Sequence, residues 1–320
     1  MTDRNLTLDV LKLVLALMVV ALHAGFLSEA SPLGNFITVQ GLFRIAVPLF
    51  FVINGYYFLS VNNIKSLTNW LKRTLSLYAF WMIFYVYFWL RPDEFSLIEL
   101  VKTIKTLIVG YHHLWYLSGM IGAGLLTYLF KNSKSLGFHL SIICLLTGVA
   151  IQYVGNYHLL SLPILDKLAN MNFIHRNFLF LAFPFFFLGY LLNNSKYKNI
   201  ITTKMLVIGI TIGITLVILE SALNFRNPKN DGGYDNYLSL YLVCPLIFLL
   251  ANNSTKTTKN KTLALMSSAI YFIHPLILSI LRKFTELQGT GLTVLCILLS
   301  ILSSFLIISI HKNKRFRFIL

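Results

Sequence analysis

Two ionisable residues, Lys12 and His23, interrupt the apolar stretch at residues 8–27. On a helix, this spacing returns both side chains to nearly the same face, about 16 Å apart along the axis. Burying a lysine at the centre of a membrane helix costs about 2.5 to 3.5 kcal/mol on insertion scales, so such groups normally face the protein interior or a wet cavity. Asp9 lies three residues before Lys12, where it can pair with the ammonium group. The first stretch therefore predicts a polar face inside a membrane protein.

A second intramembrane histidine strengthens the case for chemistry. His274 lies about 17 Å into the stretch at residues 263–281, close to the depth of His23. A neutral imidazole with a pKa near 6.5 is suited to accept a proton from a hydroxyl at neutral pH. A purely structural alternative stays open, in which Lys12 extends to the headgroups and His23 bonds to a neighbouring helix.

Several cations at span ends have two possible roles. Arg44 opens a stretch in which Pro48 and Gly55 permit a kink and close helix packing, and it is either an interfacial anchor or a functional group. Lys72 and Arg73 precede an aromatic stretch. They are either stop-transfer charges or part of an anion site, since a guanidinium group matches phosphate geometry.

Polar residues at the outer ends of other stretches complete the candidate set. His112 and His113 are adjacent, so on a helix they point about 100° apart and cannot both face one ion well. We therefore expect no metal site. Arg176 and Glu220 also fall at outer span ends and are candidates to line the same cavity.

The composition indicates a membrane protein. Of the 320 residues 57% are hydrophobic, and the mean hydropathy is +0.72. Runs of about 20 apolar residues, the length that crosses a bilayer as a helix, recur along the chain. In lipid, every backbone polar group must form its hydrogen bond within its own helix or within a closed barrel. Since the connectors are also short, we predict an all-α polytopic bundle of about ten transmembrane helices. The predicted spans lie near residues 8–27, 41–60, 74–90, 113–130, 136–154, 177–193, 203–223, 237–251, 263–281 and 290–310.

The charge distribution predicts the orientation. If the N-terminus lies inside, most of the 27 Lys and Arg residues fall on the inner side. Of the 11 acidic residues, only Asp3 and Asp9 fall there. The positive-inside rule then places both termini in the cytoplasm. The net charge of +16 is thus explained by anionic lipid headgroups, and no nucleic-acid partner is expected. Between the spans, residues 91–112 have the pattern of an amphipathic surface helix, and residues 155–176 that of an outer loop over an acceptor site.

Several motifs, in their order and spacing, resemble the acyltransferase-3 family of integral membrane acyltransferases. They are Lys12 with His23, residues 47–51 with Gly55 and Tyr56, residues 113–116, and residues 271–275. The resemblance implies transfer of an acyl group, usually acetyl, from cytoplasmic coenzyme A to glycans or lipids of the cell envelope. It also implies a donor-side role for Lys12 and an essential catalytic role for His23.

The chain departs from the family pattern at a few positions. Lys12 stands where Arg is commoner, Asn54 stands where Ser is commoner, and Ser76 occupies a place where a second basic residue often follows Arg73. Residues 1–320 are interpreted as a single membrane acyltransferase domain, without the soluble esterase-like domain that many relatives carry.

The leading hypothesis is an acetyl-CoA-dependent O-acetyltransferase in the bacterial cytoplasmic membrane, with a cell-surface polysaccharide or its lipid-linked precursor as acceptor. Acetyl-CoA enters as the acyl donor from the cytoplasm. His23 is the expected general base, and His274 or Arg44 the expected oxyanion stabiliser. The assigned residues are His23 and His274 for catalysis, Lys12, Lys72 and Arg73 for the donor, and Arg44, His113, Arg176 and Glu220 as substrate or oxyanion candidates.

Two alternatives belong to other functional classes. A transporter or flippase for a small solute or a lipid-linked sugar also needs ionisable residues within the membrane and helices interrupted by Pro or Gly. The chain shows no pair of interrupted helices at corresponding positions of two halves, which disfavours this alternative. A helical scaffold in an envelope-assembly complex leaves the shared depth of His23 and His274 without an explanation.

Overall fold

The computed structural model describes residues 3–90, 96–193, 202–227 and 231–320, and most of these are helical. The first half of the chain contains β1 (Arg4–Asn5), α1 (Leu6–Ala24), α2 (Pro32–Val39), the 3₁₀ turn η1 (Leu42–Ile45), α3 (Ala46–Tyr57), η2 (Phe58–Ser60), α4 (Ile64–Phe84), α5 (Val86–Trp89), α6 (Leu97–Val109), η3 (His112–Leu114), α7 (Trp115–Phe130) and α8 (Lys134–Asn156). The second half contains α9 (Pro163–Asn170), α10 (Asn172–His175), the π-helical turn η4 (Phe178–Ala182), α11 (Phe183–Leu192), α12 (Thr203–Phe225), α13 (Leu238–Asn252), β2 (Thr257–Thr258), α14 (Thr262–Phe284), α15 (Gly289–Lys312) and η6 (Lys314–Ile319).

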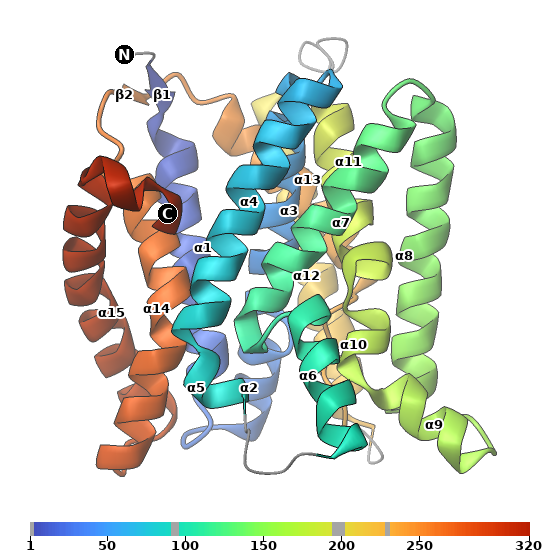
Figure 1. The fold of residues 1–320 in the computed structure, drawn as a ribbon. Helices are drawn as coiled ribbons and strands as arrows, with labels where there is room; N and C mark the ends of the chain where they lie inside the picture. Colours follow the sequence, from blue (N-terminus) through green and yellow to red (C-terminus); the bar gives the residue numbers. More distant parts are fainter. Residues whose placement is uncertain (1–2, 91–95, 194–201, 228–230) are drawn as a thin grey trace.

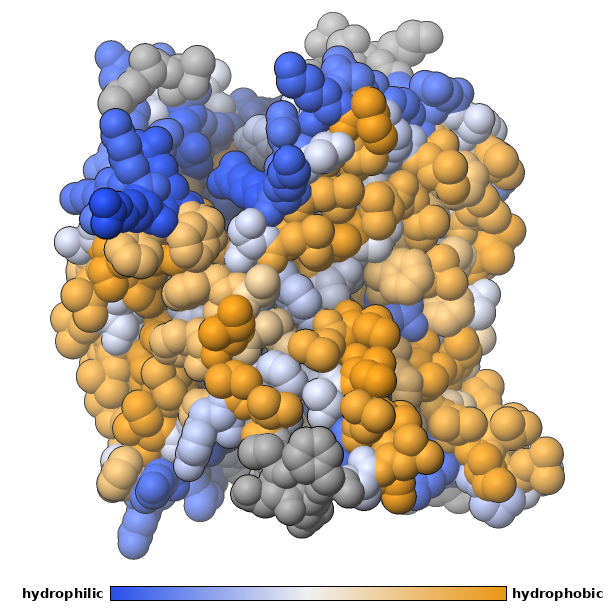
Figure 2. Space-filling view, in the orientation of Figure 1, coloured by the Kyte–Doolittle hydropathy of each residue, from blue (hydrophilic) through white to orange (hydrophobic). Residues whose placement is uncertain are grey.

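The long helices form a bundle, and the axes of most of them are roughly aligned in Figure 1. At the upper end of this view β1 and β2 form a two-stranded antiparallel pair, and the C-terminus lies in the upper half. The short helices α5 and α9 lie at the lower end. Hydrophilic residues cover much of the upper end, and a hydrophobic belt occupies the middle (Figure 2). This arrangement is the one expected of a protein that spans a bilayer.

Six of the described helical segments are long and apolar enough to cross a membrane. They are Leu6–Ala24, Pro32–Ser60, Lys134–Asn156, Thr203–Phe225, Thr262–Phe284 and Gly289–Lys312. Two shorter apolar segments, Phe178–Leu192 and Leu238–Asn252, also coincide with predicted spans. The all-α membrane fold is therefore confirmed. The count of ten crossings and the cytoplasmic position of the termini stay predictions.

Helix α4 begins earlier than the sequence suggested. Asn63 and Ser66 form a capping box, in which each side chain accepts a hydrogen bond from the other residue's backbone N–H. This arrangement satisfies two N–H groups that a helix start otherwise leaves free, so the helix starts at Ile64 instead of near residue 74. Lys72 and Arg73 consequently lie within α4 and not at the end of a loop.

The two longer connections contain helices. The predicted surface helix is α6, whose apolar side chains, such as Leu97 and Ile108, are largely exposed, while residues 91–95 lie outside the described part. The stretch at residues 155–176 is not a plain loop, because it contains α9 and α10. Pro163 starts α9, as proline commonly does at a first helical position.

Helices α3 and α11 approach each other closely through two glycines. A Cβ atom on Gly55 would lie 1.8 Å from the carbonyl oxygen of Phe186, and one on Gly189 would lie 2.0 Å from that of Val52. Only glycine permits backbones this close, as is typical of small residues at membrane helix interfaces. The packing fixes α3, and with it the η1 turn that carries Arg44.

Candidate active site

Four histidines from three separate elements meet inside the bundle. His23 comes from the last turn of α1, His112 and His113 from η3, and His274 from the middle of α14. The ring centroid of His23 lies 4.6 Å from that of His112 and 5.3 Å from that of His274, which it stacks against. The rings of His113 and His274 are 5.4 Å apart. The structure thus brings together the two histidines that the sequence placed at one depth, and adds two more.

Hydrogen bonds fix the orientation of His274. Its Nδ1 lies 2.8 Å from the carbonyl oxygen of Tyr271 and 3.2 Å from that of Ile270. Because both neighbours only accept hydrogen bonds, the proton belongs on Nδ1, which leaves Nε2 as the acceptor. This Nε2 is buried and has no hydrogen-bond partner among the described residues. An imidazole held in this way can accept a proton or bind a polar substrate group.

His113 is held in the cluster through both its backbone and its ring. The Tyr271 hydroxyl donates to the His113 carbonyl at 2.6 Å. The His113 ring is buried and lies 5.3 Å from the ring of Tyr85. The backbone of Phe272 is near enough to accept a hydrogen bond from the ring, so the position of the imidazole is fixed by α14.

Two backbone irregularities lie beside the cluster. His112 has a φ of +46°, which side chains other than glycine seldom adopt and which tends to occur at functional sites. The π-helical turn at Phe178–Ala182 begins where the Asn177 side chain accepts hydrogen bonds from the backbone of Leu179 and Phe180. Single π turns are also frequent at functional sites. His112 contacts the ring of His23, and Leu181 of the π turn lines the same cavity as His23.

A small cavity of about 40 Å³ adjoins His23. It is lined by Val19, Leu22, His23, Phe43, Arg44, Val47, Pro48, Trp115, Arg176, Leu181 and Asp235. A water molecule needs about 10 to 15 Å³ of such space, so the cavity has room for a small polar group and little more. Its charged residues are two arginines and one aspartate, and they share the cavity wall with the imidazole of His23.

The two arginines are bound to different extents. Arg44 is almost fully buried and donates to the carboxylate of Asp235, the side-chain oxygen of Gln40 and, at 3.0 Å, the carbonyl of Val39. Arg176 makes one long contact of 3.4 Å with Asp235, and its guanidinium lies 5.0 Å from the Trp115 ring. The donors of Arg44 are thus occupied by hydrogen bonds within the cavity wall, whereas Arg176 retains donors that can bind a substrate.

The candidate donor-side residues lie elsewhere along the bundle. Lys12 is partly buried, with its Nζ 3.8 Å from Asp9 and 5.5 Å from the ring centroid of Tyr57. Asp9 is buried and also accepts two hydrogen bonds from Arg4 at 2.9 and 3.0 Å. The pairing of Asp9 and Lys12 agrees with the sequence prediction. Neither partner lines the cavity beside His23.

Lys72 and Arg73 are exposed on α4. Arg73 and Arg317 lie close enough to His311, near the end of α15, to act on it electrostatically. The C-terminal turn η6 packs on α4, where the indole nitrogen of Trp81 donates to the Ile319 carbonyl at 3.1 Å. Arg73 therefore belongs to a basic surface that includes the end of the chain, separate from the histidine cluster.

Glu220 lies outside the cavity wall, where it stabilises the start of α13. Its carboxylate accepts hydrogen bonds from the backbone N–H groups of Leu238 and Ser239, both at 3.2 Å, and from the Ser239 hydroxyl at 2.6 Å. A carboxylate is favourable at a helix N-terminus because it satisfies free N–H groups and the helix dipole. The geometry of Glu220 is thus that of a helix cap.

Sequence reasoning missed His112 as a partner of His23, and it missed Asp235. Asp235 could have been suspected as an acid that follows Gly232 and Gly233 in a predicted outer loop. His175 was missed as well: it is buried, and neither ring nitrogen has a partner among the described residues. Within the described ranges, no group of three or more His, Cys, Asp or Glu side chains is arranged to hold a metal ion.

The fold and the site together define a multi-pass membrane protein with an internal imidazole centre. A family model described as an acyltransferase domain matches residues 5–310, nearly the whole chain. The chain belongs to the acyltransferase-3 family, which is named for the transfer of acyl groups.

Two curated relatives carry names of a different kind. The chain is 27% identical to an amino-acid racemase of Enterococcus faecalis and 26% identical to a serine/alanine racemase of Enterococcus gallinarum, in both cases over 98% of its own length. Each match covers 47% of the relative, so the chain spans about half of the length of these proteins. No solved structure gives a significant match.

Proposed function

We propose that this chain transfers an acetyl group from cytoplasmic acetyl-CoA to a hydroxyl of a cell-surface polysaccharide or its lipid-linked precursor, in the bacterial cytoplasmic membrane. The observation that carries the proposal is the contact of His23 with His112 and His274, beside a cavity that also holds Arg176. An imidazole base beside a cation that keeps unused hydrogen-bond donors can catalyse acyl transfer between sulfur and oxygen.

In the proposed reaction, His23 removes the proton from the acceptor hydroxyl. The hydroxyl oxygen then attacks the carbonyl carbon of the thioester, and the carbonyl oxygen becomes an oxyanion. Arg176 stabilises this charge, because its guanidinium keeps donors that make no other hydrogen bond among the described residues. The donors of Arg44, in contrast, are bound to Asp235, Gln40 and Val39. When the carbon–sulfur bond breaks, coenzyme A leaves as a thiolate and takes the proton from the His23 imidazolium.

The small size of the cavity supports acetyl as the acyl group. A space of about 40 Å³ beside His23 accommodates an acetyl carbonyl and methyl, whereas a long acyl chain would displace the side chains that line it. We assign the donor's phosphates to the hydrophilic end, where the chain termini and the basic residues of α4 lie. Lys12 lies in the first half of α1, and Lys72 and Arg73 lie in the first half of α4, and we assign their positive charge to the donor.

Mass spectrometry of surface glycan tests the proposal. Cells that express the wild-type chain are compared with cells that express His23→Ala, with the amount of protein in the membrane measured in parallel. The proposal predicts glycan carrying the mass of added acetyl groups in the first case and none in the second. His139→Ala, which removes an exposed histidine on α8, is the matched control. Acetylation at the wild-type level in His23→Ala would end the proposal.

A second candidate, transport of a small solute, is favoured by one observation. The curated relatives are named for racemisation of amino acids, serine and alanine among them, and we infer from this that an amino acid is the solute. Ionisable groups within the bundle also suit a transport path. Uptake of labelled serine by vesicles that hold the protein but no acetyl-CoA would favour this function over acyl transfer.

A further inference from the structure

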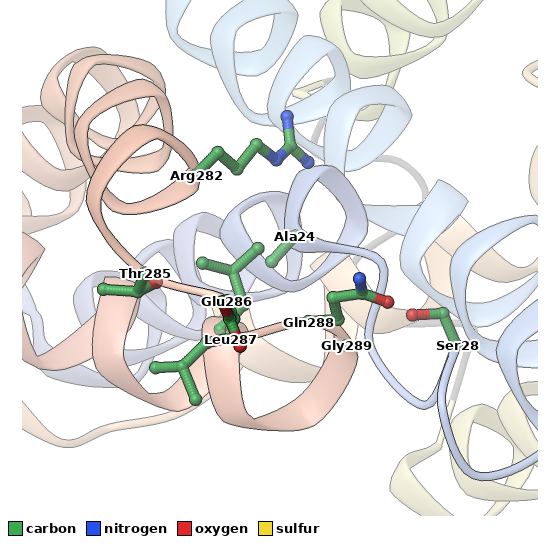
Figure 3. A pocket seen from close by; sticks show the side chains of 9 residues that line it. Ala24, Ser28, Arg282, Thr285, Glu286, Leu287, Gln288 and Gly289 are labelled. Atoms are coloured by element: carbon green, nitrogen blue, oxygen red, sulfur yellow. The ribbon is translucent and has the colours of Figure 1, made fainter.

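A cleft larger than the cavity beside His23 opens where α14 connects to α15, at the end of the molecule away from the chain termini (Figures 1 and 3). Its volume is about 330 Å³, at the lower end of the range of roughly 300 to 1,000 Å³ seen for small-molecule sites. It is lined by Ala24, Ser28, Arg282, Thr285, Glu286, Leu287, Gln288, Gly289 and Leu292. None of the residues assigned to catalysis or to the donor lines it.

The lining offers donors and acceptors side by side. The carboxamide of Gln288 and the hydroxyl of Ser28 point toward each other, and the Arg282 side chain extends from α14 toward the end of α1 (Figure 3). The Thr285 hydroxyl donates to the Leu281 carbonyl at 2.8 Å, so its oxygen remains free to accept. Neighbouring leucines supply apolar surface. This mixture suits a sugar ring, whose hydroxyls both donate and accept and whose C–H face is apolar.

The cleft shares a wall with the catalytic end of α1. Ala24, which lines the cleft, directly follows His23 in the chain. The Arg282 guanidinium, which also lines the cleft, donates to the His23 carbonyl at 2.7 Å. A ligand in the cleft therefore lies next to the turn of helix that presents the proposed general base.

The rim of the cleft is held in shape before any ligand binds. Both carboxylate oxygens of Glu29 accept from the backbone N–H of Thr290, at 2.9 and 3.0 Å. Gly289 has a φ of +51°, a backbone angle that favours glycine, and a Cβ atom there would displace the Glu29 carboxylate, which would lie 1.5 Å away. A rim that is already ordered spares a ligand the entropy cost of ordering it.

The charges of the cleft favour an uncharged ligand. Arg282 and Glu286 contribute opposite charges, and the carboxylate of Glu286 would repel a phosphate or a second carboxylate. We propose that this cleft binds the sugar ring of the acceptor glycan and presents one of its hydroxyls toward His23. The inference rests on the proposed acetyltransferase function, which it extends to the acceptor.

Steady-state kinetics of the full chain in vesicles test the inference. The acceptor probe is unacetylated surface glycan purified from cells that lack the protein, and the donor is labelled acetyl-CoA. The test variant carries Glu286→Leu and Gln288→Leu, both at exposed positions. The control is Lys283→Leu, an exposed position of α14 that does not line the cleft. Removing two sets of hydrogen bonds should raise the KM for glycan by about tenfold or more.

The expected result is specific to the acceptor. In the double variant, the KM for acetyl-CoA and the kcat stay within about twofold of the wild type, and the control is unchanged in all three constants. An unchanged KM for glycan would overturn the inference, as would a fall in kcat alone or a parallel rise in both KM values. If the wild-type chain itself transfers no label to glycan, the proposed function fails and the inference falls with it.

Discussion

His23 in α1 stacks against His274 in α14, with ring centroids 5.3 Å apart, although the two residues come from opposite ends of the chain. The contact depends on close packing of the two helices, which is also seen where the Ser267 hydroxyl donates to the Lys12 carbonyl at 3.0 Å. The candidate site is therefore assembled by tertiary structure, and folding of the whole bundle is a condition for its chemistry.

The first prediction concerns His274. Replacing it with Asn removes the free Nε2 while the shorter amide can still donate to the carbonyl of Tyr271. We expect acetyl transfer to fall by about 100-fold, because a properly placed acid or base contributes roughly 10² to 10⁴ in rate. Initial rates with labelled acetyl-CoA measure the effect. The two histidines act on one step, so the double variant with His23→Ala should be little worse than His23→Ala alone.

The second prediction concerns Asp235, which pairs with Arg44 and Arg176. Asp235→Asn leaves the buried Arg44 without a counter-charge, which should cost about 3 to 5 kcal/mol of stability. The melting temperature of the purified protein measures the loss. Glu99→Gln is the matched control, because it breaks the exposed pair with Lys102 and should cost at most about 1 kcal/mol. Equal melting temperatures for the two variants would contradict the assigned role of Asp235.

The third prediction concerns the contact between α3 and α11. Gly55→Ala places a Cβ atom against the Phe186 carbonyl, so the helices must separate. We expect a loss of about 3 kcal/mol or more, at or above the upper end of overpacking effects. Gly291→Ala is the control, since its nearest neighbour lies 3.5 Å away in ordinary contact. Thermal unfolding compares the two variants, and a tolerated Gly55→Ala would show that the helices are not packed this closely.

The fourth prediction concerns a pH-dependent contact in the connection after α8. His158 lies 2.6 Å from Asp166 and 3.1 Å from Asp231, and the hydrogen bond to Asp166 raises the pKa of His158 above its ordinary value. A raised pKa means that the folded form binds the proton more tightly. The stabilisation is therefore complete below the ordinary pKa and lost as the pH rises through the raised one.

Limited proteolysis checks this prediction. Cleavage around α9 should be slower at about pH 6 than at about pH 8, where the imidazole becomes neutral. His158→Gln should be cleaved at similar rates at both values, because no charge remains to titrate. A wild-type cleavage rate that does not respond to pH, or that falls as the pH rises, would contradict the assignment.

Much of the fold follows from the sequence because apolar periodicity and length are local properties. The predicted stretches near Lys12 and His274 fall on α1 and α14, and the amphipathic pattern before His112 falls on α6. The start of α4 was predicted about ten residues late, because apolar character alone ignored the capping box at Asn63.

The site was less accessible to sequence reasoning. The depth of His23 and His274 could be estimated from helix geometry, but which helices are neighbours could not. Only a metal site formed by His112 and His113 was considered for the adjacent histidines, and it was set aside because adjacent residues on a helix diverge by about 100°. His112 contacts His23 from a 3₁₀ turn with a left-handed backbone angle, which the sequence does not reveal. Asp235 depends on a loop that folds back onto Arg44, again a tertiary feature.

The account depends most directly on acetyl passing through the bilayer to an acceptor on the other side. Inverted vesicles that enclose unacetylated glycan are supplied with labelled acetyl-CoA on their exposed cytoplasmic face, and label in the enclosed glycan is counted. Wild-type protein should label the glycan, and His23→Ala should give no more label than vesicles without protein. Equal labelling by His23→Ala, or none by the wild-type chain present in the same amount, would contradict the account.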